Sequence, residues 1–180
     1  MKLYSAACER NQTYIADILV ERFCTPGTIL EVASGTGMHA VYFAQRMPHV
    51  HWQPTDIGSD ALLSIEAWRH DARTENLLAP VRLDVSEIPW NIDSLPTPIV
   101  GIFNANMIHI SPWTATVGLF RGAGRHLHSG GELITYGPYR FNGRMAESNM
   151  RFDESLKTRD PAWGVRDFEA IVDLALAEHL

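Results

Sequence analysis

Short apolar runs alternate along the chain with longer amphipathic segments. Five runs are rich in β-branched or other apolar residues and are bounded by Gly or Pro, a pattern typical of buried strands. They are Thr28–Val32, His49–Gln53, Val81–Val85, Ile99–Phe103 and Glu132–Tyr136.

Apolar residues in the segments between these runs recur at helical spacing. Helices are therefore expected over Ile15–Phe23, Met38–Met47, Ser59–Asp71, Pro112–Leu127 and Asp167–Leu180. Side chains at three helix starts can serve as N-caps, namely Ser59, Ser111 and Asp167. Positions predicted to face the core in two of the helices are Ile15, Ile18, Leu19, Phe23, Leu62, Leu63, Ile65 and Trp68. Strands and helices in this alternation predict an α/β fold with a parallel sheet of about five strands, helices on both faces and right-handed crossovers.

The segment after the fifth run breaks this alternation. Residues 137–166 are 30 residues with little periodicity and with turn signals such as Asn142-Gly143 and Asp160-Pro161. A connection of that length is typical of a lid or a binding loop. No linker to a second domain is visible, so we expect one domain over residues 1–180, with an N-terminal segment and helix in 1–27 and a lid-like insertion at 137–166.

Composition narrows the classes of partner. The 180 residues are 46% hydrophobic and carry 15 basic against 21 acidic side chains, a formal net charge of −6. This balance, without any basic run, argues against binding of nucleic acid through its phosphates. The chain has no run long enough to cross a membrane and no signal peptide, and its two cysteines, Cys8 and Cys24, are too few for a disulfide scaffold. We expect a cytoplasmic protein with reduced thiols.

A glycine-containing loop follows the first predicted strand. Gly35 and Gly37 lie where that strand turns into a helix, and glycine there lets the backbone lie against a nucleotide-like ligand. With Ala40 they also fit the dinucleotide pattern G-x-G-x-x-G/A, which keeps NAD(P) as an alternative. A tight turn without any ligand is the other alternative.

Two acidic residues near this loop favour a cationic ligand. Glu31, four residues before Gly35, suits an ammonium group and would repel a pyrophosphate. Asp56 follows Gly37 by 19 residues, close to the spacing of an acid that accepts ribose hydroxyls. The pattern favours S-adenosylmethionine.

At these residues the chain resembles the class I S-adenosylmethionine-dependent methyltransferases over nearly its whole length. The resemblance implies that Glu31 binds the methionine moiety, Asp56 the ribose and Asp84 the adenine amine. It also implies that Gly35 and Gly37 pass beneath the methionine moiety and that Ile57 and Val85 sandwich the adenine ring. The other predicted cofactor-binding residues are Arg10, Ser34, Thr36 and Asn104, and the alternative for Arg10 is a surface pair with Glu9. Ala33 departs from the family pattern, which usually has its first glycine at this position. The extra methyl group is expected to narrow the part of the cofactor site that holds the methionine moiety. The chain also ends without the family's C-terminal antiparallel strand pair, so its fifth strand is expected at an open edge. Either a homodimer covers that edge or the chain is a piece of a longer protein.

Longer strings are similar to one branch, the methyltransferase-like 26 family. They are Ala7-Cys8-Glu9-Arg10-Asn11, residues 33–43, residues 104–113 and Tyr136-Gly137-Pro138-Tyr139. This resemblance implies a fold and a cofactor and is silent on the substrate.

Candidate catalytic residues follow the fourth and fifth strands, where open parallel sheets bind ligands. His109 is a candidate general base and Tyr136 a second catalytic candidate. The alternative for His109 is a half-buried ring bonded to a backbone carbonyl. Asn104 begins no Asn/Asp-Pro-Pro-aromatic motif, so methylation of a base or amide nitrogen is not predicted.

The lid-like insertion supplies candidates for substrate binding. It carries six basic against four acidic side chains, which suits a substrate bearing a carboxylate or phosphate. Ion pairs internal to the insertion, and aromatic residues that only pack, are the alternatives. The predicted substrate-binding residues are Asn106, Tyr139, Asn149, Arg151, Trp163 and Arg166.

These observations predict a protein that binds S-adenosylmethionine and transfers its methyl group to a small molecule, without a metal. One alternative is a catalytically inactive scaffold or sensor that binds the cofactor. The other is an NAD(P)-dependent oxidoreductase.

Overall fold

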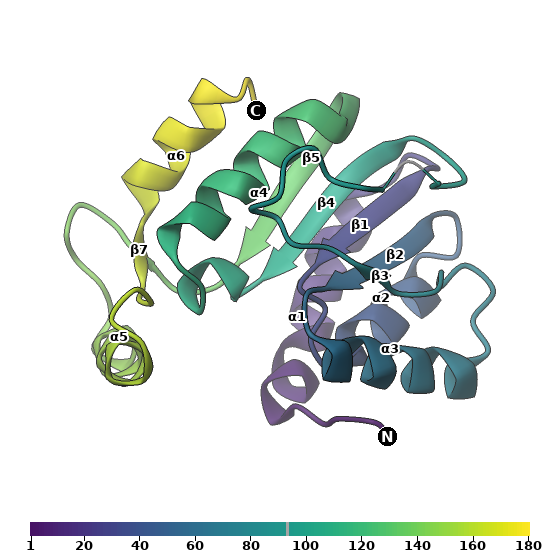
Figure 1. The fold of residues 1–180 in the computed structure, drawn as a ribbon, viewed down its shortest axis with the longest axis horizontal. Helices are drawn as coiled ribbons and strands as arrows, with labels where there is room; N and C mark the ends of the chain where they lie inside the picture. The colour runs from purple at the N-terminus through teal and green to yellow at the C-terminus, as the bar shows by residue number, and fades with distance from the viewer. Residues whose placement is uncertain (93) are drawn as a thin grey trace. The chain divides into compact units, whose positions relative to one another are not determined.

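The computed structural model describes residues 1–92 and 94–180, which form two compact units. The two units are described separately, and both can be followed in Figure 1. The first unit comprises residues 1–84, 91–104 and 127–134, without residue 93. The second comprises residues 85–90, 105–126 and 135–180.

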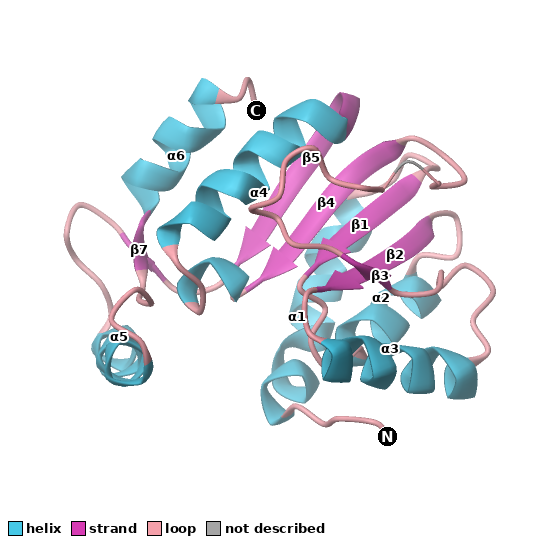
Figure 2. Ribbon diagram, viewed as in Figure 1, coloured by secondary structure: helices cyan, strands magenta, loops and turns pink. Residues whose placement is uncertain are grey.

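Five strands form one parallel sheet in the order β3-β2-β1-β4-β5, shown in magenta in Figure 2. Their bounds are β1 Thr28–Val32, β2 His51–Asp56, β3 Val81–Arg82, β4 Ile99–Ala105 and β5 Leu127–Tyr136. The predicted α/β fold with five strands in its sheet is confirmed, and β5 is the edge strand. The predicted third strand is too long, because the chain leaves the sheet after the backbone N–H of Leu83 donates to the Asp56 carbonyl at 3.1 Å.

Six α-helices accompany the sheet in the described residues. They are α1 Ala6–Arg22, α2 Met38–Arg46, α3 Ser59–Ala72, α4 Trp113–His126, α5 Glu147–Arg159 and α6 Phe168–Ala177. A short 3-10 helix, η1 Met107–His109, follows β4. None of the described helices is long and apolar enough to cross a membrane.

The three predicted caps differ from those in the structure. Gly58, not Ser59, is the N-cap residue of α3. Asp167 is the N-cap residue of α6, but its side chain makes no capping bond and pairs instead with Arg140, at 3.3 Å between Nη1 and Oδ1. The hydroxyl of Ser111 donates to the Met107 carbonyl at 2.7 Å and is thereby engaged outside α4. Other partners of the Ser111 hydroxyl and the Asp167 carboxylate explain the last two differences, whereas Ser59 is already the first residue within α3.

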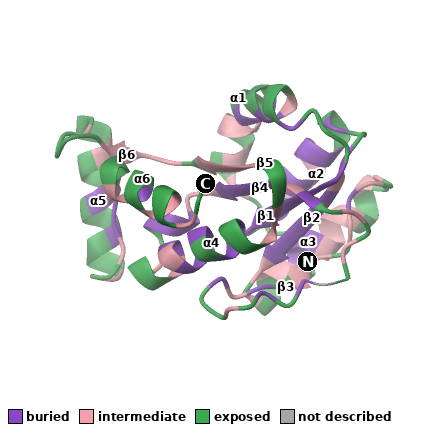
Figure 3. Cartoon of the chain, turned by 90° about the horizontal axis from the view of Figure 1, so that it is seen from above, coloured by how far each residue is buried: buried purple, intermediate pink, exposed green. Residues whose placement is uncertain are grey.

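A cluster of aromatic rings forms the centre of the first unit. Phe43 of α2 packs edge-on against Trp52 of β2 and Phe103 of β4, with ring centroids 5.4 and 5.5 Å apart. The central strands are buried along most of their length, as the purple segments of Figure 3 show. Two positions predicted to face this core point to solvent instead, since Ile18 is 54% and Leu63 64% exposed.

The insertion predicted as an irregular lid contains a helix. Residues 147–159 form α5, of which only Asp153 and Leu156 are buried. A helix with so little buried surface has no apolar stripe, which is why periodicity did not predict it. Flanking it, β6 Tyr139–Arg140 and β7 Arg166–Asp167 pair as a second, two-stranded parallel sheet.

Candidate functional site

The loop between β1 and α2 has a left-handed backbone at three positions. Ala33, Gly35 and Gly37 have φ values of 57°, 58° and 87°. A side chain at Gly37 would collide with Ile65, whose Cα would be 2.7 Å from the new Cβ, so close helix packing requires this glycine. A side chain at Gly35 would meet nothing within 4 Å. The loop therefore presents an open backbone surface at Gly35, as a ligand cradle requires.

Ala33 provides a first test of this loop. Replacing Ala33 with Gly is expected to raise the free energy of unfolding by about 1 kcal/mol, because a left-handed backbone costs an L-residue roughly 1–2 kcal/mol and the greater chain entropy of glycine offsets part of the gain. Urea denaturation measures the change. Ala61→Gly, in α3, is the matched control and should lose about 1 kcal/mol. An equal loss in both variants would contradict the strain at Ala33.

Asp56 holds the loop at the end of β2. Its Oδ2 accepts the backbone N–H of Gly35 at 2.9 Å, and its Oδ1 accepts that of Gly58 at 2.9 Å. A carboxylate has about four acceptor positions, so each oxygen can accept one further hydrogen bond. The aspartate predicted to bind a ribose is thus fixed in orientation and has acceptor capacity for two hydroxyl groups.

Ser34 and Thr36 are engaged within the protein. The Ser34 hydroxyl accepts the backbone N–H of Thr55 at 3.2 Å and lies 3.4 Å from the Glu31 carbonyl, to which it donates. Thr36 accepts the Ser64 hydroxyl through its carbonyl at 2.7 Å. These bonds tie the loop to β2 and α3, so both residues shape the cradle.

Glu31 lies at the end of β1 with only 2% of its surface exposed. Its Oε2 accepts the indole N–H of Trp52 at 2.9 Å. Burial raises the pKa of the Glu31 carboxyl from its usual 4.5 to about 7, against the opposing hydrogen bonds from Trp52 and Ser34. A buried carboxyl poised near neutrality favours a cationic partner, which would stabilise its ionised form.

Asn104, the partner of Val32 in the β1–β4 register, has an unsatisfied buried atom. Its amide donates to the Val32 carbonyl at 2.9 Å, while its Oδ1 has no hydrogen-bond partner within the described part of the chain. Buried acceptors are nearly always paired in native proteins, so this oxygen calls for a donor from a ligand or water. The residue predicted to bind the cofactor thus has a free acceptor at the carboxyl end of β4.

The remaining predicted cofactor residues differ in exposure. Ile57 is 55% exposed directly after β2, which leaves its side chain able to cover a flat ring. Arg10 is exposed on α1, and Asp84 is half-buried at the end of the first unit. Val85 is buried in the second unit. The structure thus groups Glu31 and Asp56 with the loop, whereas these four roles stay predictions.

Sequence reasoning missed a buried polar pair beside the loop. The Nε2 atom of His39, in the first turn of α2, lies 2.8 Å from Oδ1 of Asn11 on α1. His39 stacks on Phe43, and burial lowers its pKa from 6.5 to about 4. Both residues fall in the longer strings that the sequence analysis singled out, Ala7-Cys8-Glu9-Arg10-Asn11 and residues 33–43, which was the signal available in the sequence.

His109 lies in the second unit, in η1, and is fully buried. Neither ring nitrogen has a hydrogen-bond partner of ordinary geometry among the described residues. A Cβ added to Gly137 would lie 2.5 Å from Nε2, so the ring packs directly against the backbone of that glycine. Burial lowers the pKa of His109 to about 4, the positive charge of Arg166 acts in the same direction, and a contact with the Gly164 backbone opposes them. The ring is neutral at physiological pH.

Two predicted residues, Tyr139 and Asn106, contact this histidine, and a third, Tyr136, is bonded to Asn106. The Tyr139 ring packs edge-on to His109 at 5.3 Å, and its hydroxyl lies 2.6 Å from Oγ1 of Thr135. The backbone N–H of Asn106 donates to the Tyr136 carbonyl at 2.8 Å, and the Asn106 carbonyl accepts the N–H of His109 at 2.9 Å. Tyr136 itself is 39% exposed. The segment after β4 is therefore joined to the end of β5 in the second unit, and the catalytic roles of His109 and Tyr136 stay predictions.

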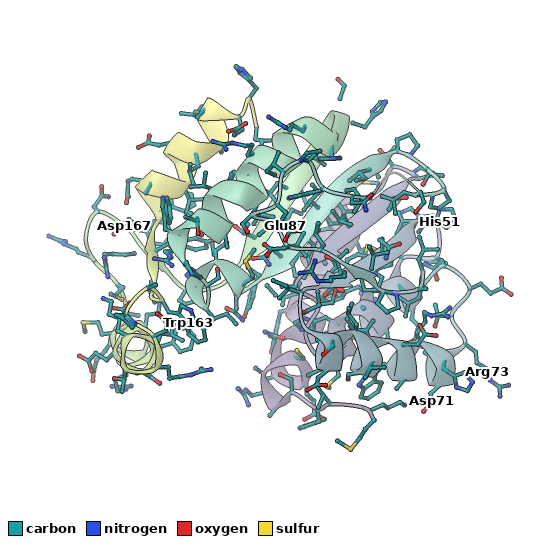
Figure 4. All side chains as sticks on the ribbon, in the orientation of Figure 1. His51, Asp71, Arg73, Glu87, Trp163 and Asp167 are labelled. Carbon is teal, nitrogen blue, oxygen red and sulfur yellow. The ribbon has the colours of Figure 1, made fainter. Side chains whose placement is uncertain are left out.

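A groove of about 370 Å³ in the second unit contains two of the predicted substrate residues, Trp163 and Arg166. Trp163 and the neighbouring Asp167 are labelled in Figure 4. Trp113, Arg140 and Lys157 also line it and were not predicted. Asn149 and Arg151 lie on α5 outside this lining, and Arg151 pairs with Glu147 at 2.6 Å. The cationic insertion thus contains a defined groove, with a lining different from the predicted set.

Comparisons with known proteins agree with the fold. The chain is 34% identical over 127 residues to the ribosomal RNA small subunit methyltransferase C of Yersinia enterocolitica serotype O:8 / biotype 1B (strain NCTC 13174 / 8081), covering 64% of this chain and 33% of that protein. An O-methyltransferase family protein from Burkholderia thailandensis has a TM-score of 0.80 at 13% identity, covering 97% of this chain and 52% of that one. A geranyl diphosphate C-methyltransferase from Streptomyces coelicolor A3(2), in complex with Mg²⁺, geranyl diphosphate and S-adenosyl-L-homocysteine, has a TM-score of 0.72 at 11% identity, covering 94% and 62%.

These similarities establish the Rossmann-like methyltransferase fold. The chain spans about a third of the length of the ribosomal RNA methyltransferase and roughly half of the Burkholderia protein. A family model matches residues 2–180, nearly the whole chain. The chain therefore belongs to the family described as "Protein of unknown function (DUF938)".

Proposed function

We propose that this protein binds S-adenosylmethionine through its first unit and transfers the methyl group to a small-molecule acceptor. The observation that carries the proposal is the Asp56 carboxylate, which accepts the Gly35 N–H at 2.9 Å and retains acceptor capacity beside an open glycine. A methyltransferase fold surrounds this arrangement.

The residues around the loop fit the parts of that cofactor. Glu31 would accept the ammonium of the methionine moiety, and the unsatisfied Oδ1 of Asn104 offers a second acceptor. Asp56 would accept the ribose hydroxyls, and Ile57 would cover the adenine. Asp84, in the same unit, is the proposed partner of the adenine amine. Bound S-adenosylmethionine supplies an electrophilic methyl group on a sulfonium.

Methyl transfer from a sulfonium requires little acid-base catalysis from the protein. It depends on orientation of the acceptor, exclusion of water and removal of a proton where the acceptor carries one. His109 is the proposed proton acceptor, because its ring is neutral and both nitrogens lack ordinary partners in the described chain. Tyr136 and Asn106, joined by a backbone hydrogen bond, are proposed to line the acceptor's approach.

Calorimetric titration with S-adenosylhomocysteine tests the proposal. Asp56→Asn is expected to weaken binding at least tenfold, because charge-assisted hydrogen bonds contribute roughly 1.5–3 kcal/mol each. Asp60→Asn, an exposed residue in the first turn of α3, is the control and should bind like the wild type. Equal dissociation constants for the wild type and Asp56→Asn would place the ribose elsewhere.

The same preparation distinguishes the alternatives. An oxidoreductase would be stabilised against heating by NADH and not by S-adenosylhomocysteine. A binding scaffold would be stabilised by S-adenosylhomocysteine but would not demethylate S-adenosylmethionine with any acceptor of a broad screen. The shared strings, which include His39 and Asn11, support membership of the methyltransferase-like 26 branch as part of this proposal.

A further inference from the structure

Arg166 lies in the groove of the second unit without a direct ion pair to a carboxylate of the described chain, and Asp153 acts on its charge only from a distance. Its Nε donates to the Ile108 carbonyl at 2.8 Å, and its Nη2 donates to the carbonyls of Ser111 at 2.7 Å and Ala162 at 3.0 Å. Within the described chain no carboxylate lies within ion-pair distance of this guanidinium. Carbonyl oxygens fix its orientation but do not cancel its charge.

The guanidinium retains donors for a ligand. Arginine has five N–H groups, and the three carbonyl bonds use those of Nε and Nη2. In the described chain the two on Nη1 have no hydrogen-bond partner, and Nη1 is not among the buried unsatisfied atoms, so it is not completely buried. Arg166 therefore offers a fixed, partly desolvated pair of donors to an anion, where charge-assisted bonds are strong.

The charges around the groove indicate whether that anion carries one negative charge or two. Lys157 pairs with Asp153 at 2.6 Å, and Arg140 lies 3.3 Å from Asp167 and 3.7 Å from Asp153. Together with Arg166 the groove has three cations, which are set against the two carboxylates of Asp153 and Asp167, so one positive charge is left over. A monoanion matches this surplus better than a phosphate dianion does.

The residues that line the groove indicate the chemistry of the rest of the ligand. Trp113 and Trp163 line the groove together with Pro161. The Arg166 guanidinium lies 5.6 Å from the Trp113 ring centroid, which keeps that indole oriented beside the anion position. The volume of about 370 Å³ suits a small ligand, being near the lower end of the roughly 300–1,000 Å³ of small-molecule sites.

We infer that this groove binds an aromatic monocarboxylate, with Nη1 of Arg166 on the carboxylate and the Trp113 and Trp163 side chains against the ring. The assignment of this ligand as the methyl acceptor rests on the proposed function. The binding site itself rests on the groove alone, so the two can fail separately.

The test is calorimetric or NMR titration with 4-hydroxybenzoate and cinnamate, and with the corresponding neutral amides, in the absence of cofactor. The carboxylates are expected to bind at least about tenfold more tightly than the amides, because one charge-assisted hydrogen bond contributes about that much to affinity. Arg166→Gln should remove this preference. Arg144→Gln removes the same charge from an exposed position of the insertion outside the groove and should leave both affinities unchanged.

Because Arg166 also holds three carbonyls, its variant is checked by thermal melting, and Lys157→Gln provides a second measurement. The Lys157 amine is half exposed and touches none of those carbonyls, so this variant should fold and weaken carboxylate binding several-fold. Equal binding of acids and amides, tighter binding of phenyl phosphate, or equal losses in Lys157→Gln and Arg144→Gln would overturn the inference. Titration with S-adenosylhomocysteine on the same samples reports on the proposed function independently.

Discussion

Glu31→Gln is expected to abolish a loss of stability that the wild type suffers between about pH 4.5 and pH 7. Burial raises the pKa of the Glu31 carboxyl from 4.5 to about 7, so the folded protein keeps its proton in a range where the unfolded chain has released it. The stabilisation by the protonated form is complete below pH 4.5 and is lost as the pH rises to 7. A difference of this size corresponds to roughly 3 kcal/mol, at about 1.4 kcal/mol per pH unit.

Glutamine preserves the local contact. Its carbonyl oxygen can accept the indole N–H of Trp52, which lies 2.9 Å from Oε2 of Glu31. Urea denaturation of both proteins at pH 4.5, 6 and 8 measures the effect, and the difference between them cancels other titrating groups. A constant difference in free energy of unfolding across this range would show that Glu31 titrates normally.

The same substitution is expected to weaken the binding of the cofactor. At pH 8 the ionised Glu31 would pair with the ammonium of S-adenosylhomocysteine, and a charge-assisted bond of this kind is worth roughly 1.5–3 kcal/mol, about ten- to a hundred-fold in affinity. Glu31→Gln should therefore gain stability and lose ligand affinity at pH 8. A variant that loses both would be misfolded, and one that binds like the wild type would contradict the proposed role of Glu31.

The order of the elements was predictable because the first unit follows simple patterns. Thr28–Val32 is an apolar run closed by glycines, and its predicted bounds are those of β1. Helix α5 was not predictable, because the burial of Asp153 and Leu156 alone leaves no apolar period. Its stability comes from ion pairs such as Lys157–Asp153, which contribute little to a hydrophobic pattern.

The site was predictable where the spacing of residues along the chain places them at the ends of adjacent strands. Asp56 and the glycine loop belong to adjacent strands, so their spacing placed them together, as the Gly35–Asp56 bond confirms. The partnership of Glu31 with Trp52 depends on side-chain direction inside the core and could not be read from spacing. The pairing of Arg151 with Glu147 could not be read from the sequence either, because it depends on helix α5, which shows no apolar period.

His109→Asn is expected to reduce methyl transfer by roughly 10²–10⁴-fold, the usual contribution of a general base. The sequence predicts a rate that rises with pH through about 6.5, the ordinary imidazole value. The structure moves this transition, because burial and the nearby Arg166 lower the pKa of His109 to about 4. The contribution of His109 to turnover should therefore be constant between pH 6 and pH 8.

If His109 has a structural role, different results are expected. The ring is fully buried against Gly137 and Tyr139, so Asn would leave a void and lower the melting temperature. Because the folded pKa lies below that of the unfolded chain, the neutral ring stabilises the fold fully above pH 6.5 and less as the pH falls towards 4. His109→Asn should reduce this acid sensitivity in either role, so stability alone does not separate them.

Turnover of the folded fraction separates the two roles. It is measured with an acceptor found by screening with labelled methyl donor, starting from the aromatic carboxylates, alongside His126→Asn, whose ring stacks on Trp90 in the same unit. A catalytic His109 loses turnover by two orders of magnitude or more while its affinity for S-adenosylhomocysteine stays unchanged, and His126→Asn keeps turnover within a few-fold. If His109→Asn also stays within a few-fold after correction for the unfolded fraction, the ring serves packing, and the proton acceptor must be sought elsewhere or is not needed by a carboxylate acceptor.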